Sequence, residues 1–66
     1  MDKQERDMVI EVVYDAKDGL FAMEIGEAVN QRFHKPMTTR EVEQIIQKNP
    51  KLFVEDNGKY KCPNNF

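Results

Sequence analysis

Tryptophan is absent from this chain of 66 residues, and cysteine and histidine occur once each. A single cysteine cannot form an internal disulfide, and with one histidine it cannot supply the ligands of a structural zinc site. No apolar run approaches the length of a membrane span, and the N-terminus lacks the basic and apolar segments of a signal peptide. We therefore expect an intracellular protein, cytoplasmic or nuclear, with no membrane partner, metal or other cofactor.

Catalytic motifs are missing as well, since there is no glycine-rich phosphate-binding loop and no Ser-His-Asp set. Glu24 and Glu27 form a carboxylate pair, but we expect them on a helix surface, and a chain this short has little room for a pocket around them. Cys62 lacks an adjacent base that would activate it as a nucleophile. The lone His34 lies in an expected turn, where we read it as an exposed side chain. We expect neither an enzyme nor a small-molecule substrate.

Charge is distributed unevenly along the chain. Residues 1–30 contain eight acidic and three basic side chains, a net charge of −5, whereas residues 31–66 contain seven basic and four acidic side chains, a net charge of +3. A basic region indicates contact with an anion, and nucleic acid is the commonest large anion. The sequence pI of about 5.3 is nevertheless far below the values typical of nucleic-acid modules. We therefore expect weak, salt-dependent binding by the domain alone.

Helical periodicity marks the first half of the chain. Apolar residues recur every three or four positions in residues 3–17, with acidic residues on another face, and Gly19 is expected to cap this helix. Residues 20–23 are predicted to form a short strand or an extended linker. A second helix is predicted over residues 24–33, where the internal Gly26 suggests that another helix crosses closely.

A third helix is predicted from a capping signal. Pro36 disfavours helical geometry at the preceding residue and ends the second helix. The Thr38–Glu41 segment then matches the S/T-x-x-E capping box. We predict a helix over Thr39–Lys48, closed by Asn49 and Pro50.

A β-hairpin is predicted after the third helix. Residues 52–55 and 59–62 alternate between apolar and polar side chains around Asn57 and Gly58, and Asn-Gly between two such runs is the strongest short-range hairpin signal. The side chains expected to share one face of this hairpin are Phe53, Tyr60 and Cys62.

Most large apolar side chains are expected in the core, because a chain of this length needs nearly all of them there. Ile10 and Tyr14 lie off the main apolar stripe of the first helix and form a second apolar edge. That edge is either a dimer contact or covered by the tail that carries Phe66. We expect core positions for the methionines, which could otherwise form an adaptable binding surface, and for most of the aromatic side chains, which could otherwise stack on single-stranded bases. These residues are Met8, Met23, Met37, Phe21, Phe33, Phe53 and Tyr60.

The predicted order of helix, short strand, helix, turn, helix and two-stranded hairpin resembles the winged helix-turn-helix superfamily. The resemblance covers about residues 4–62, and its most specific parts are the short segment at 20–23, the capped third helix and the hairpin directly after it. Within the superfamily, residues 32–36 and 49–54 are similar to the small LOTUS and HARE-type domains. The resemblance implies an α+β fold and a single winged-helix domain over residues 1–66, with a frayed tail at 63–66.

The resemblance also implies a role for most of the basic residues. In winged helices that bind DNA, the third helix enters the major groove, while the wing and the turn before the helix contact phosphates. Arginine can read guanine there and glutamine can read adenine. Glu43, expected in the middle of the recognition face, and the acidic Glu55 and Asp56 of the wing depart from a strong DNA binder. The residues implied in nucleic-acid contact are Thr39, Arg40, Gln44, Gln47 and Lys48 in the groove and Arg32, Lys35, Lys59 and Lys61 on the backbone.

These observations lead us to expect a nucleic-acid-binding domain with a regulatory or recruiting role, for example in transcription regulation. Duplex DNA is the expected ligand, and RNA remains an alternative. A second reading is a protein-interaction winged helix or a homodimer that uses the acidic first helix or the edge formed by Ile10 and Tyr14. A third is a purely structural domain whose basic residues form an ordinary solvated surface.

Overall fold

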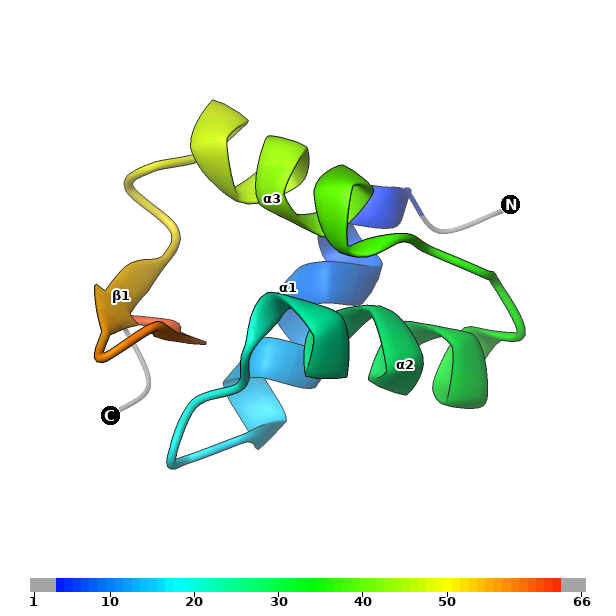
Figure 1. Ribbon diagram of the computed structural model, residues 1–66, viewed down its shortest axis with the longest axis horizontal. Helices are drawn as coiled ribbons and strands as arrows, with labels where there is room; N and C mark the ends of the chain where they lie inside the picture. The colour runs from blue at the N-terminus through cyan, green and yellow to red at the C-terminus, as the bar shows by residue number, and fades with distance from the viewer. Residues whose placement is uncertain (1–3, 64–66) are drawn as a thin grey trace.

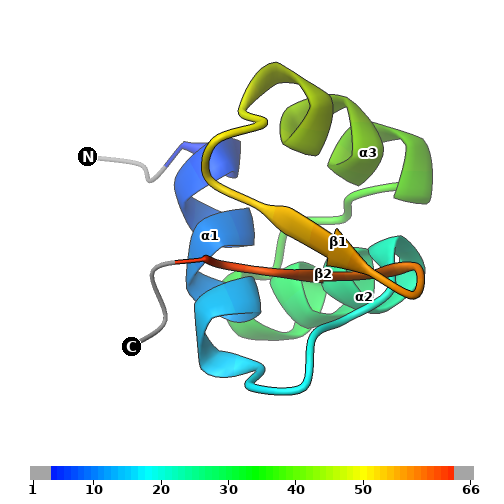
Figure 2. The same cartoon turned by 90° about the vertical axis from the view of Figure 1, so that its left-hand side faces the viewer.

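Three helices and one β-hairpin make up the fold, which a computed structural model describes for residues 4–63 (Figure 1). The hairpin runs across one side of the three helices, and its second strand contacts the first helix (Figure 2). The arrangement belongs to the α+β class. The elements in chain order are α1 (Glu5–Asp15), α2 (Ala22–Phe33), α3 (Thr39–Lys48), β1 (Val54–Asp56) and β2 (Lys59–Lys61).

The hydrophobic core draws on all three helices. Burying an aliphatic side chain contributes about 1.5–3 kcal/mol relative to leaving it exposed, so these positions dominate the stability of the fold. Phe53, just before β1, is also buried and closes the core on the side of the hairpin. The largest fully buried side chains are Val9 and Val13 of α1, Ile25 and Val29 of α2, and Val42 of α3.

The predicted third helix is confirmed, with both bounds as expected. The Thr38 hydroxyl accepts the N–H of Glu41 at 3.1 Å, and the Glu41 carboxylate accepts the N–H of Thr38 at 2.9 Å. This reciprocal capping box satisfies two backbone donors that a helix N-terminus otherwise leaves without a partner.

The end of the first helix differs from the prediction. The helix ends at Asp15 and Ala16 is its C-cap, so the assignment of Gly19 as the cap is wrong. Gly19 instead lies in the turn that follows, where its N–H donates to the carbonyl of Ala16 at 3.0 Å and its φ is +85°. Gly19 is thus a turn residue, but it lies in the turn after the C-cap rather than at the C-cap itself.

The second helix begins two residues earlier than predicted. The Glu24 carboxylate accepts the N–H of Phe21 at 2.9 Å, which caps a helix starting at Ala22. A strand over residues 20–23 is therefore wrong for the last two positions. Leu20 alone makes an isolated antiparallel bridge, exchanging hydrogen bonds of 3.1 and 2.7 Å with the backbone of Tyr60.

The predicted hairpin is confirmed. β1 and β2 pair antiparallel, with Val54 opposite Lys61. Asn57 and Gly58 both have positive φ, at 55° and 84°, which is the requirement of a type I′ turn. The shared face is also confirmed, because Phe53 is buried and both Tyr60 and Cys62 pack against the core.

Two side chains expected in the core lie on the surface instead. Met23 is 61 % exposed and Phe21 is 45 % exposed. Phe21 precedes α2 and lies beside the hairpin, with the Nζ atom of Lys59 5.4 Å from its ring centroid. Because α2 starts earlier than expected, Met23 lies in the first turn of this helix, with its side chain on the surface.

Gly26 lies where α2 passes the backbone before α3. A Cβ atom at this position would be 2.6 Å from the Met37 carbonyl oxygen, a separation that real Cβ atoms essentially never show. The expected close neighbour was another helix. Val42 of α3 does lie in ordinary contact, at 3.7 Å, but the closest approach is made by the extended segment leading into α3.

We predict that Gly26→Ala destabilises the fold although alanine is the better helix former. The gain in helix propensity of about 1 kcal/mol is outweighed because backbone, rather than a flexible side chain, must move to admit the methyl group. We expect a net loss of about 1 kcal/mol or more in the free energy of unfolding, measured by urea titration. Glu27→Ala, at the exposed neighbouring position, serves as the control and should leave stability unchanged or slightly raised. A stabilised Gly26→Ala variant would contradict the close approach.

Candidate functional site

The outward face of α3 carries the central residues of the predicted nucleic-acid site. At 100° per residue, Arg40, Gln44 and Gln47 lie within a narrow sector opposite the buried Val42. All three are exposed, as are Thr39 and Lys48 on the flanks. Within residues 4–63, neither Arg40 nor Lys48 forms an ion pair, so both cationic groups are available to a ligand.

Arg32 and Lys35 have a different environment. The Nη1 atom of Arg32 lies 2.7 Å from Asp15 Oδ2 and 3.8 Å from Glu11 Oε1. The Nζ atom of Lys35 lies 3.9 Å from Glu5 Oε2. These contacts hold α2 and the following turn against the acidic surface of α1. A phosphate would compete with these carboxylates for both cations.

The hairpin lysines are half-buried and also engaged. Lys61 Nζ lies 3.4 Å from Asp56 Oδ2 across the hairpin, and Lys59 lies over the ring of Phe21. The aliphatic parts of both lysines cover Gly19. Their ammonium groups are therefore less available than those of Arg40 and Lys48.

Glu43 lies toward the hairpin edge of the α3 face rather than in its middle. Burial raises the pKa of Tyr60, and the carboxylates of Glu55 and Glu43 raise it further. Glu43 is thus within electrostatic range of the Tyr60 hydroxyl in β2. It places negative charge between α3 and the hairpin, where a nucleic-acid backbone would have to pass.

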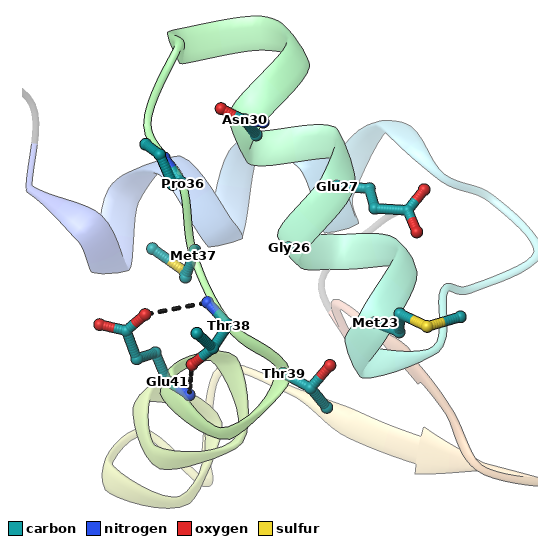
Figure 3. A pocket seen from close by; sticks show the side chains of 9 residues that line it. All are labelled: Met23, Gly26, Glu27, Asn30, Pro36, Met37, Thr38, Thr39 and Glu41. Carbon is teal, nitrogen blue, oxygen red and sulfur yellow. Dashed lines mark hydrogen bonds between the residues drawn. The ribbon is translucent and has the colours of Figure 1, made fainter.

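A groove of about 450 Å³ lies between α2 and the segment that enters α3 (Figure 3). The sequence did not predict this groove, although the glycine inside α2 indicated a close approach at this point. Gly26 lets the two segments approach at this point, and the capping box of Thr38 and Glu41 forms one side. The remaining lining residues are Met23, Glu27, Asn30, Pro36, Met37 and Thr39.

A smaller recess of about 110 Å³ lies at the predicted second apolar edge. It is lined by Ile10, Tyr14, Leu52, Cys62 and Pro63. The tail carrying Phe66, one of the two predicted covers for this edge, lies outside the described residues. Burial raises the pKa of the Cys62 thiol, which keeps it protonated and poorly nucleophilic at neutral pH.

Among residues 4–63, no three His, Cys, Asp or Glu side chains gather as a metal site. None of the helices in that range is long and apolar enough to cross a membrane. Comparisons with family models, with curated proteins and with solved structures gave no significant match.

We predict that Arg32→Gln lowers stability by less than about 1 kcal/mol, because the ion pairs that it removes are solvent-exposed. Salt screens such pairs, so the difference from the parent protein should shrink further as ionic strength rises. Urea unfolding at low and high salt measures both effects. A loss of several kcal/mol that persists at high salt would contradict a surface role for Arg32.

Glu41 provides a prediction about pH. The N–H and hydroxyl of Thr38 lower the pKa of Glu41 below its usual value of 4.5. Because the pKa is lower in the folded than in the unfolded state, the stabilisation is present above about pH 4.5 and is lost as the pH falls through the folded value. Thr38→Ala should raise this pKa toward 4.5 and cost about 1 kcal/mol at neutral pH.

The side-chain carboxyl shift of Glu41, followed by NMR as the pH is lowered, measures that pKa. Thr38→Ser keeps the hydroxyl and is the matched control, so its Glu41 should titrate as in the parent protein. Identical titrations for Thr38→Ala and Thr38→Ser would show that the hydroxyl does not contribute to the lowered pKa of Glu41.

Proposed function

We propose that this chain is a winged helix-turn-helix domain that binds nucleic acid, with duplex DNA as the ligand. The fold part of the proposal is supported by the order of the elements and by the bridge between Leu20 and Tyr60. That bridge pairs a single residue with β2, at the position where the resemblance implies a short strand. The hairpin directly after α3 corresponds to the wing.

One observation carries the functional part of the proposal: the outward face of α3 joins two exposed amides to two cations that form no ion pair within residues 4–63. Arg40 and Gln44 are four residues apart and project side by side. Arginine donates two hydrogen bonds to the major-groove edge of guanine, whereas the amide of glutamine donates one hydrogen bond to adenine N7 and accepts one from adenine N6. Lys48, near the C-terminal end of the helix, is suited to a phosphate contact.

The charges also limit the strength of this interaction. Arg32, Lys35 and Lys61 have carboxylate neighbours, so only a few cations contribute strongly. Affinity falls with salt in proportion to the number of phosphates neutralised, and few contacts mean a shallow dependence and weak binding. A domain of this kind gains useful affinity when it is paired or joined to a second binding module.

Paired alanine substitutions test the α3 face. We predict that Arg40→Ala combined with Lys48→Ala weakens binding to a mixed-sequence DNA duplex by at least about tenfold, because it removes one base-reading side chain and one phosphate contact. Fluorescence anisotropy of a labelled duplex at low salt measures the change. Arg6→Ala combined with Lys17→Ala is the matched control, since it removes two exposed cations elsewhere and should change binding little. If both double variants weakened duplex binding equally, the effect would come from net charge and not from the α3 face.

Glu43→Gln is the complementary variant. Removing negative charge between α3 and the hairpin should strengthen duplex binding, with the fold unchanged. Parent-like binding by both Glu43→Gln and the Arg40 and Lys48 double variant would overturn the proposed face.

A further inference from the structure

The groove beside Gly26 is a second surface, separate in chemistry from the outward face of α3. Two methionines give the groove its apolar lining. Met37 is buried, whereas Met23 is 61 % exposed. Methionine side chains are flexible and polarisable, and they adapt to differently shaped apolar groups. The groove thus offers apolar contact area with an adjustable outline.

The charged side chains that line the groove are both carboxylates. Glu27 comes from α2 and Glu41 from α3, and they lie on opposite sides of the groove (Figure 3). Glu41 Oε1 accepts the N–H of Thr38, whereas its Oε2 atom makes no hydrogen bond within residues 4–63. The nearby Lys35 is directed at Glu5 of α1, at 3.9 Å. Two carboxylates therefore border the apolar centre of the groove, and Lys35, which does not line it, acts on Glu41 from outside.

This charge pattern separates two classes of ligand. A nucleic-acid backbone would meet two carboxylates here and be repelled, in contrast to the α3 face. A basic peptide would find complementary charge on both sides while placing an apolar side chain between the methionines. The size is appropriate too, since pockets for small ligands and anchor side chains begin at about 300 Å³.

We propose that this groove binds a short peptide segment in which an apolar side chain is flanked by lysine or arginine residues. The apolar side chain lies between Met23 and Met37, over Gly26, and the flanking cations contact Glu27 and Glu41. The hydroxyl of Thr39 and the amide of Asn30 are available to hydrogen-bond the peptide backbone. This proposal does not depend on DNA binding, because it involves none of Arg40, Gln44, Gln47 and Lys48; Thr39 is the one predicted nucleic-acid residue that also lines the groove.

Methionine methyl NMR tests the groove directly. The probe is a blocked synthetic pentapeptide with a central leucine flanked by two lysines on each side. Titration of protein labelled at the methionine methyl carbons should shift the Met23 and Met37 signals and leave that of Met8, which does not line the groove, unmoved. A peptide with glutamates in place of the lysines, and one with serine in place of the leucine, should each bind more weakly.

Charge reversal in the groove supplies the second measurement. Glu27→Lys should lower the affinity for the lysine–leucine peptide by about threefold to tenfold, as expected when an exposed attractive charge pair becomes repulsive. Glu43→Lys makes the same change on α3 outside the groove and should leave peptide affinity unchanged. Both positions are exposed, so unfolding is not expected, and circular dichroism confirms this for each variant.

Three results would overturn the proposal. They are an absence of Met23 and Met37 shifts at millimolar peptide, equal binding of the lysine and glutamate peptides, or equal weakening by Glu27→Lys and Glu43→Lys. None of these results bears on duplex binding by α3, which is measured separately.

Discussion

The contact between the backbone of α2 at Gly26 and the carbonyl of Met37 sets the geometry on which both proposed surfaces depend. The missing side chain lets the segment before α3 lie directly on α2. Val42 can then reach the core beside Ile25 and Val29, so the opposite face of α3 is turned toward solvent. The same close approach forms the floor of the groove. A larger residue at this position would alter the placement of α3 and the shape of the groove together.

Electrostatics then distinguishes the surfaces that the packing creates. The acidic residues of α1 pair with Arg32 and Lys35, which removes much of the basic excess seen in the second half of the chain. Within residues 4–63, Arg40 and Lys48 on the outward face of α3 form no ion pair, while Glu27 and Glu41 border the groove. A low overall pI is compatible with the proposed nucleic-acid function, because a local group of cations can attract an anion whatever the net charge of the domain.

Local signals in the sequence predicted the fold well. Thr38 and Glu41 determine the start of α3, and Asn57 with Gly58 determines the hairpin turn, since each acts through neighbours within a few residues. Two errors were local, the C-cap assigned to Gly19 and the start of α2, and the others arose where distant segments meet. Nothing near Gly26 reveals that its neighbour is the Met37 carbonyl, and nothing near Arg32 reveals its pairing with a carboxylate 17 positions earlier. The α3 face was predicted from helical periodicity, whereas the groove requires the tertiary fold.

Amide chemical-shift mapping with a mixed-sequence DNA duplex, at low and at moderate salt, tests the central claim most directly. We expect the shifts to be concentrated on residues 39–48, with smaller shifts in the hairpin. All of them should diminish as salt is raised. Arg32 and Lys35 should respond weakly because carboxylates of α1 occupy their cationic groups. Shifts centred on the groove or on α1, or no shifts even at low salt, would contradict the assignment of α3 as the nucleic-acid face.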